Sequence, residues 1–303
     1  MADRLDVTKT YKLYIDGKFP RSESGRTVAV NDAKGKVLAH LSKASRKDLR
    51  DAVTAARKAQ PGWKDATAYL RGQILYRMAE MMEGKRDEFA AALRAGGLAM
   101  SAAEREVTAS VDRLVAFAGW ADKYAQVLGC NNAVAGPYYN FTVPEPSGVV
   151  VAVGPDEPGL LGLISLIAPA ACSGNAVVAL AGEGTGAAVS AVVLGEVMAT
   201  SDVPAGVVNI LTGERAELVP VAAGHRDVDA VVAFSGPGGL SDDLRRVLRE
   251  GAAENVKRVV VRDLGRVKGG REGVDLFDPG RCESPWWIEP TVEMKTIWHP
   301  SAV

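Results

Sequence analysis

Cysteine and histidine are scarce in this sequence of 303 residues. The three cysteines are Cys130, Cys172 and Cys282, and the three histidines lie far apart along the chain. Three scattered thiols argue against a disulfide framework and fit a reducing compartment such as the cytoplasm. Because no spacing of Cys and His is typical of a metal site, we expect no metal centre.

The sequence also lacks an excess of charge of either sign. Lys and Arg total 36, Asp and Glu total 37, and the net charge is -1. Without surplus basic residues to neutralise phosphates, nucleic acid and anionic membranes are not expected partners. Gly, Pro and acidic residues interrupt the longest apolar stretches, and the first residues contain no apolar signal sequence. We therefore expect neither a transmembrane helix nor an export signal.

The second part of the sequence, residues 148–263, alternates apolar runs of strand length with helical stretches. Continuous Val-rich strands imply burial on both faces, and strand–helix–strand alternation implies parallel pairing. This pattern predicts an α/β fold with a doubly wound parallel, Rossmann-like sheet and a ligand site at the carboxyl ends of its strands. The expected strands are Val149–Val153, Ala176–Leu180, Val207–Leu211, Ala230–Phe234 and Arg258–Val261. The expected helices are about Gly159–Ala171, Gly186–Ala199, Ala216–Ala223 and Leu240–Gly251.

The first part of the sequence predicts short strands over residues 11–42, followed by helices. Ser45 and Asp48 form a capping-box pattern that begins the first helix, and Pro61-Gly62 is expected to end it. A second helix is expected from about Ala68 to Met82, with Leu70, Met78 and either Met81 or Met82 facing inward. A third, long helix is expected over about Ala102 to Tyr124.

The segment between these two parts has a different character. Tyr138–Val143 is aromatic and typical of a β-strand, and Pro137 and Pro144 flank it. It predicts an exposed strand or hairpin arm. Such an arm pairs with another chain or folds back on its own domain, and the sequence leaves both interpretations open.

A series of short motifs carries a family likeness. In order they are Ile15-Asp16-Gly17-Lys18, Gly119–Lys123, Pro146–Val150, Ile167–Ala170, Gly174–Val178, Pro204–Asn209, Phe234-Ser235-Gly236 and Leu264-Gly265. This series resembles the amino-terminal, cofactor-binding part of the aldehyde dehydrogenase superfamily over about residues 11–265. Trp287–Val292 resembles a motif that lies beyond the catalytic domain in that family. The chain thus resembles a member with most of its catalytic domain excised, similar to the non-catalytic second module of tandem aldehyde dehydrogenases.

The resemblance implies a domain organisation. Residues 1–129 and 147–265 would form a cofactor-binding-like domain, and residues 130–146 would form a β-arm for oligomerisation. Residues 266–303 would form a short tail in place of the catalytic domain. A sheet without its neighbouring domain exposes apolar surface, so we expect this tail to cover it with Trp286, Trp287, Ile288 and Trp298.

Two catalytic positions of the family are degenerate here. After the first core strand the family carries an Asn that donates to the oxyanion, and Glu157 stands there, where an ionised carboxylate would repel the oxyanion. Alternatively, Asp156 and Glu157 cap the helix that follows. The family's general-base Glu falls on Asp263. No cysteine follows in the context of the nucleophile, and Cys282 is interpreted as an incidental loop thiol instead of a reactive one. We therefore assign no catalytic residue.

The resemblance implies NAD or NADP as the cofactor. Its candidate binding residues are Glu183 and the glycines Gly236, Gly238 and Gly239. Leu180 stands where the family has a ribose-binding Lys, and Pro237 removes a backbone N–H and a side-chain hydroxyl next to the pyrophosphate. A plain tight turn explains the glycines equally well, and we expect weak binding or none.

These features predict a cytoplasmic pseudoenzyme, a structural or regulatory subunit that forms a homodimer or a hetero-oligomer with a full-length NAD(P)-dependent aldehyde dehydrogenase. Two alternatives remain open. The chain could act as an oxidoreductase on aldehydes in a composite site completed by another subunit, or it could be a nucleotide-sensing module.

Overall fold

A five-stranded parallel sheet forms the centre of the computed structural model, which describes residues 7–32, 35–265 and 272–301. The Val-rich runs form its strands, so the predicted doubly wound α/β fold is confirmed. The strand order is β10–β9–β6–β7–β8, and it reverses between β6 and β9, because the chain builds outward from β6 in both directions. The strands are β6 (Val149–Val153), β7 (Ala176–Leu180), β8 (Val208–Leu211), β9 (Ala230–Ser235) and β10 (Arg258–Asp263).

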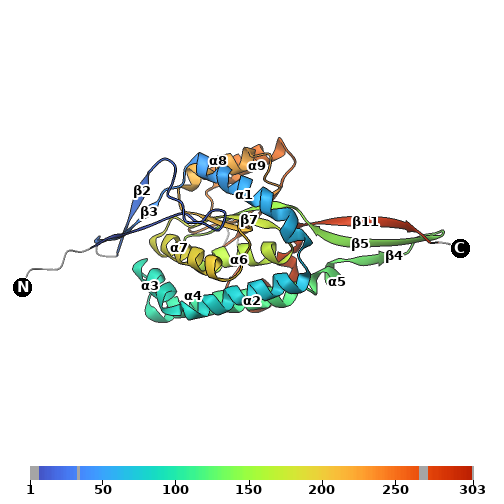
Figure 1. Cartoon of the computed structure of the whole chain (residues 1–303), viewed down its shortest axis with the longest axis horizontal. Coiled ribbons are helices and arrows are strands. Elements are labelled where there is room, and N and C mark those ends of the chain that lie inside the picture. Colours follow the sequence, from blue (N-terminus) through green and yellow to red (C-terminus); the bar gives the residue numbers. More distant parts are fainter. Residues whose placement is uncertain (1–6, 33–34, 266–271, 302–303) are drawn as a thin grey trace, which may run out of the picture.

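Helices cover both faces of this sheet (Figure 1). Alternate residues of each strand face opposite cores: Val149 and Val151 face one, and Val150 and Ala152 face the other. Burial on both faces explains why the strands are continuously apolar. One face is covered by α1 (Arg46–Asp65), α8 (Arg215–Gly224) and α9 (Asp242–Ala253), the other by α6 (Gly159–Cys172) and α7 (Thr185–Thr200).

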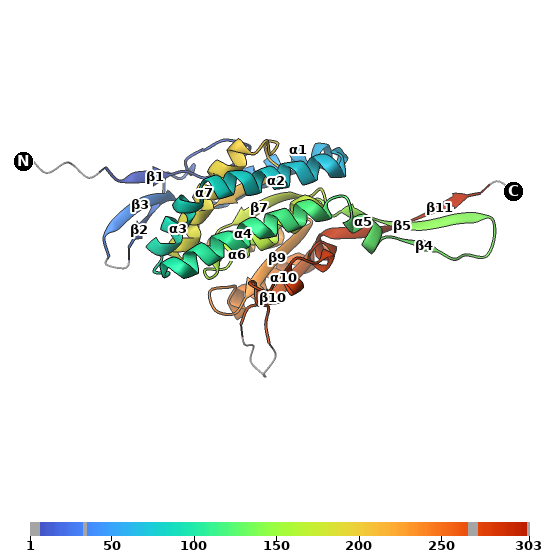
Figure 2. The ribbon, with the colours of Figure 1, turned by 90° about the horizontal axis from the view of Figure 1, so that it is seen from below.

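A further layer of helices lies outside α6 and α7 (Figure 2). It consists of α2 (Ala68–Gly84), α3 (Arg86–Ala95) and α4 (Met100–Trp120), and the short α5 (Tyr124–Leu128) follows. The prediction missed α3 and α5 and extended the helix of α4 past its end at Trp120 to Tyr124. Leu70, expected inward, is 44% exposed, because Arg71 takes the inward position and donates through Nε to the carbonyl of Cys172 at 3.1 Å. No helix in the described ranges is long and apolar enough to cross a membrane.

The amino-terminal residues form a small separate sheet with the order β1–β3–β2. Its strands are β1 (Lys9–Tyr11), β2 (Thr27–Asn31) and β3 (Val37–Ser42). The capping box of Ser45 and Asp48 at the start of α1 is confirmed. The expected end of α1 at Pro61 is wrong. The helix continues to Asp65, and buried Trp63 anchors its last turn by donating through Nε1 to the carbonyl of Ala171 at 2.9 Å.

The predicted arm is a three-stranded antiparallel sheet that projects away from the main body (Figures 1 and 2). Its strands are β4 (Cys130–Asn132), β5 (Tyr138–Pro146) and β11 (Val292–Pro300), in the order β11–β5–β4. The outer strand β11 comes from the tail and pairs with every residue of β5. The arm is therefore built from two segments that lie far apart in the sequence.

The tail covers part of the sheet before it reaches the arm. Its short helices are α10 (Pro279–Cys282), η1 (Pro285–Trp287) and η2 (Glu289–Thr291). Trp287 and Ile288 are buried in the same core as α6, as expected. The expectation is wrong for Trp286 and Trp298, which are 58% and 59% exposed. Trp298 lies in β11, where pairing with β5 carries it away from the main sheet.

Candidate functional site

The candidate site lies at the carboxyl edge of the sheet, where the strand order reverses between β6 and β9. Doubly wound sheets bind their ligands in the crevice at this point. The predicted site residues all come to this edge. Glu157 follows β6, Glu183 follows β7, Gly236–Gly239 follow β9, and Asp263 ends β10.

The glycine-rich turn after β9 follows a backbone path that requires glycine. Gly236 and Gly238 have φ angles of 99° and 69°, in the left-handed region that residues with side chains rarely adopt. The turn also rests directly on the loop after β6. The amide of Asp156 donates to the carbonyl of Gly238 at 2.7 Å, and a Cβ on Gly238 would lie 3.0 Å from the Cβ of Asp156. The two loops that flank the crevice are thus in contact.

A buried arginine that sequence reasoning missed, Arg215, connects the loops. It is 6% exposed, lies at the start of α8, and donates to the carbonyls of Gly154 at 3.1 Å and Gly239 at 3.3 Å. It also forms an ion pair with Asp156. The signal that could have revealed it is the presence of two acids, Asp156 and Glu183, at neighbouring strand ends without a basic residue beside them in the sequence.

Glu183, the predicted cofactor residue after β7, is engaged in the same network. Its Oε1 accepts a hydrogen bond from the amide of Arg215 at 2.6 Å, at the first turn of α8. Its own amide donates to Oδ1 of Asp156 at 2.6 Å, and the amide of Gly184 donates to the same oxygen at 3.2 Å. Leu180, at the end of β7, is 1% exposed and packed in the core, so this apolar side chain offers no donor to a ligand.

The structure contradicts the interpretation of Asp156 and Glu157 as caps of α6. Glu157 is exposed, and no side chain of the preceding loop caps the helix. Instead, Glu106 of α4 reaches across, and its Oε1 accepts from the amides of Leu160 at 2.8 Å and Leu161 at 3.2 Å. Burial raises the pKa of Glu106, and the two amides oppose that shift. The packing of α4 against α6 places this carboxylate there, which a local sequence pattern cannot indicate.

Asp263, which the resemblance places at the position of the family's general base, is held by neighbouring side chains. Ser235 donates through Oγ to its carboxylate, and a guanidinium nitrogen of Arg245 lies 4.0 Å away. These contacts come from the adjacent strand and from α9. The carboxylate therefore has local partners for its charge and its lone pairs.

Two of the three cysteines are buried, and the third lies in the arm. Cys172 is buried at the end of α6, and burial raises the pKa of its thiol to about 12. Cys282 is buried in α10, not exposed in a loop, and donates to the carbonyl of Asp275 at 3.2 Å; burial raises its pKa too. Cys130 is exposed in β4 of the arm. The two buried thiols are inaccessible to a substrate, and their raised pKa values disfavour the reactive thiolate.

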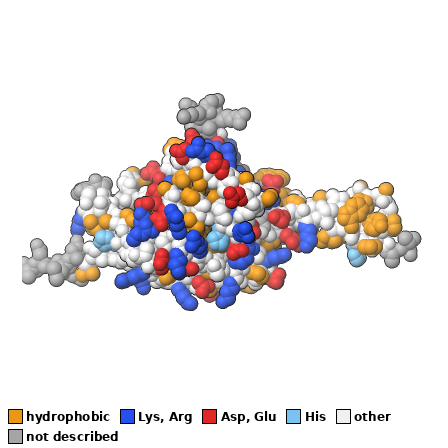
Figure 3. All heavy atoms as spheres, turned by 90° about the horizontal axis from the view of Figure 1, so that it is seen from above, with side chains coloured by type: hydrophobic (Ala, Val, Ile, Leu, Met, Phe, Trp, Pro, Cys, Tyr) orange, Lys and Arg blue, Asp and Glu red, His pale blue; other side chains and the backbone are white. Residues whose placement is uncertain are grey.

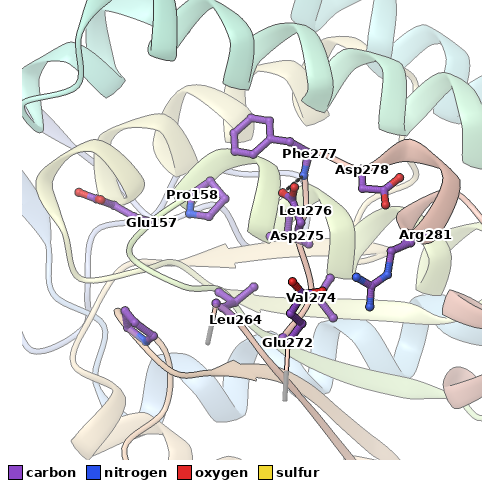
Figure 4. Close-up of a pocket in the computed structure, with 13 residues that line it drawn as sticks. Glu157, Pro158, Leu264, Glu272, Val274, Asp275, Leu276, Phe277, Asp278 and Arg281 are labelled. Atoms are coloured by element: carbon purple, nitrogen blue, oxygen red, sulfur yellow. Dashed lines mark hydrogen bonds between the residues drawn. The ribbon is translucent and has the colours of Figure 1, made fainter. Parts of the chain in front are cut away.

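A hollow of about 560 Å³ lies beside the crevice, between the loop after β6 and the segment that follows β10 (Figure 4). Among the residues that the structure describes, its lining carries four carboxylates and the guanidinium of Arg281; the acids are Glu157, Glu272, Asp275 and Asp278. A second hollow of about 220 Å³ is lined by Lys43, Glu183 and Glu214, among others. Within the residues that the structure describes, no group of His, Cys, Asp and Glu side chains could hold a metal ion.

Comparison with known proteins gives a consistent picture. Residues 19–265 match the aldehyde dehydrogenase family. The chain is 33% identical to a putative aldehyde dehydrogenase, DhaS, of Bacillus subtilis, over 84% of this chain and 50% of that protein. It is 34% identical to retinal dehydrogenase 2 of Gallus gallus, over 92% of this chain and 55% of that protein.

A solved structure shares the fold. The NAD+ complex of an aldehyde dehydrogenase from Bacillus cereus superimposes with a TM-score of 0.78 at 27% identity, over 85% of this chain and 52% of that one. The chain therefore spans about half the length of the relatives that it matches.

Proposed function

The chain belongs to the aldehyde dehydrogenase family, and we propose that within this family it is a non-catalytic, cytoplasmic subunit. It associates through its arm with a second copy of itself or with a full-length aldehyde dehydrogenase. Its domains are the cofactor-binding-like body and the arm of β4, β5 and β11. The body resembles a cofactor-binding domain, and common ancestry accounts for this fold even if the chain does not oxidise aldehydes.

The position of the thiols is the observation that carries the non-catalytic part of this proposal. The family's reaction needs a cysteine nucleophile, and activation of a cysteine requires a lowered pKa. Here the two thiols of the body are buried with raised pKa values, and the exposed thiol lies in the arm. Glu157 brings a negative charge to the edge where an oxyanion would form, and Asp263 is engaged with Ser235.

The chemistry of the arm supports a role in association. A single sheet layer has no core of its own, yet both faces of this one carry large apolar side chains. Tyr139 and Phe141 share one face with rings 5.2 Å apart, and Tyr138 and Trp298 share the other at 5.7 Å. Figure 3 shows hydrophobic side chains gathered along the outer part of the arm. Exposed apolar surface of this kind is typical of protein interfaces.

The catalytic part of the proposal is tested on the purified chain. NAD(P)H formation is followed by absorbance with NAD or NADP and a panel of aliphatic, aromatic and retinoid aldehydes. We expect no rate above the protein-free control. A rate of NAD(P)H formation that disappears in Cys282→Ala would overturn the proposal and show that the chain is an enzyme. A rate that arises only on addition of a full-length aldehyde dehydrogenase, above that enzyme's own rate, would favour a composite site.

The association is tested by light scattering on the chain alone and mixed with a full-length aldehyde dehydrogenase from the same source. We expect a dimer or a hetero-oligomer that Tyr139→Asp dissociates. Tyr69→Asp is the matched control, because Tyr69 is also an exposed tyrosine, at 70%, but lies on α2. If the chain is a monomer at high micromolar concentration and does not bind the full-length enzyme, the subunit role is wrong. Equal effects of the two substitutions would exclude the arm as the interface.

A further inference from the structure

Arg215 and Asp156 together occupy the crevice that a doubly wound sheet normally offers to its ligand. The crevice lies between the ends of β6 and β9. Arg215 begins α8, which follows the edge strand β8. Its side chain extends from there across the crevice and donates to carbonyls at the ends of both β6 and β9. Because only 6% of the Arg215 residue is exposed there, its side chain fills the space instead of lining a cleft.

Asp156 completes the arrangement with an anionic group. Its Oδ1 accepts from the guanidinium of Arg215 and from the amides of Glu183 and Gly184, where α7 begins. A cation and a helix amino terminus are the partners that proteins use to hold a phosphate. The carboxylate therefore has the surroundings of a bound phosphate, but it belongs to the chain itself.

The remaining space does not form a continuous dinucleotide cleft. The larger hollow includes Glu157 and Pro237, the smaller one includes Glu183 and Glu214, and neither is lined by Asp156 or Arg215. The larger hollow is also rich in carboxylates, which repel the pyrophosphate of NAD. The residues present thus do not fit the cofactor of the family in this conformation.

We propose that the Asp156–Arg215 pair is an internal latch that replaces a bound nucleotide. It holds together the loops after β6, β7, β8 and β9, as a dinucleotide would, and thereby excludes nucleoside phosphates from the crevice. The latch stands apart from the subunit role of the arm, because it concerns the body of the molecule alone. Two consequences can be measured: the energetic coupling between the side chains of Asp156 and Arg215, and the binding of nucleotides to the crevice.

The coupling is measured with a double-mutant cycle of Asp156→Ser, Arg215→Ala and both, by calorimetric melting. Asp156→Ser should lower Tm by roughly 5–10 °C, because it leaves the buried charge of Arg215 unpaired. Arg215→Ala should lower Tm less, because the side chain of Asp156 is 31% exposed and keeps the two amide donors. The double variant should be no worse than the poorer single one. The same substitutions in the exposed α9 pair, Asp243→Ser and Arg246→Ala, are the matched control and should change Tm by about 1 °C or less. If the Tm losses of Asp156→Ser and Arg215→Ala simply add in the double variant, the proposed latch is wrong.

Ligand binding is measured by thermal shift and calorimetry with ADP and NAD. The wild type should bind neither. Asp156→Ser should bind ADP with a Kd at least about tenfold below the highest ADP concentration at which the wild type shows no binding, because a phosphate can take the place of the carboxylate between Arg215 and the α7 amides. Arg215→Ala should gain nothing, since it retains the anion.

Two results would refute the exclusion of nucleotides: stabilisation of the wild type by ADP or NAD, or no gain in Asp156→Ser. If that variant does not fold, Asp156→Asn removes the charge while keeping an acceptor oxygen; because its amide still fills the site, a smaller gain of the same sign is expected of it. Aldehyde oxidation or a lack of oligomers would refute the proposed function without bearing on this cycle.

Discussion

The contrast between two adjacent tryptophans tests whether the tail is part of the core. Trp287 is 6% exposed, and its ring lies 6.2 Å from that of Phe234 on β9. The guanidinium of Arg262 stacks over it at 4.3 Å, and its Nε1 donates to the carbonyl of Arg281 at 3.0 Å. Trp286, one residue earlier, is 58% exposed. Replacing each with alanine removes the same atoms from opposite environments.

Trp287→Ala should lower the free energy of unfolding by about 3–5 kcal/mol, the usual loss when a buried Trp becomes Ala. For a chain of this size that corresponds to a fall in Tm of at least about 6 °C, at roughly 2 °C per kcal/mol. Trp286→Ala should change stability by about 0.5 kcal/mol or less, as exposed substitutions do. Urea unfolding followed by far-UV circular dichroism measures both without depending on tryptophan fluorescence.

The outcome that refutes this reasoning is equal stability of the two variants. If Trp287→Ala lost less than about 1 kcal/mol, the tail would contribute little to the core, and β9 and β10 would have to be stable without that cover. If Trp286→Ala lost as much as Trp287→Ala, the exposed ring would instead have a partner, such as a second chain.

Titration and thiol chemistry supply the remaining tests. Burial lowers the pKa of Lys257 to about 8 from its ordinary 10.5, so its charge is penalised below pH 8 and the penalty disappears as the pH rises to 10.5. The wild type should therefore gain stability relative to Lys257→Met across that window, and a constant difference in urea would contradict this. Burial raises the pKa of Glu106 above 4.5, so its contribution is present below pH 4.5 and is lost as the pH rises through the folded pKa. The wild type should accordingly lose stability relative to Glu106→Gln as the pH rises from 4.5 through the raised pKa, and parallel curves would refute the burial argument. DTNB should modify one thiol rapidly in the native protein, and a fast phase that survives in Cys130→Ser would show a second accessible cysteine.

The residues of the candidate site divide into those that a motif could indicate and those that it could not. Glu157, Glu183 and the glycines after β9 follow predictable strands, so their arrival at one edge was foreseeable from parallel pairing. Ser235 and Glu106 were not foreseeable as partners, and two acids without a nearby base gave only an indirect signal for Arg215. They come from other elements, and only the packed structure brings them within hydrogen-bonding distance of that edge or its helices.

The sequence by itself determined the central sheet and the existence of the arm. Val-rich runs with helical intervals indicate a parallel sheet whose two faces are both covered by helices, and this local signal is independent of distant partners. Tertiary structure alone decided the rest. It extended α1 past Pro61 because Trp63 is anchored in the core, and it drew β11 into the arm to pair with β5. It also closed the crevice with Arg215, because the place of a long side chain depends on charges and carbonyls that lie on other strands.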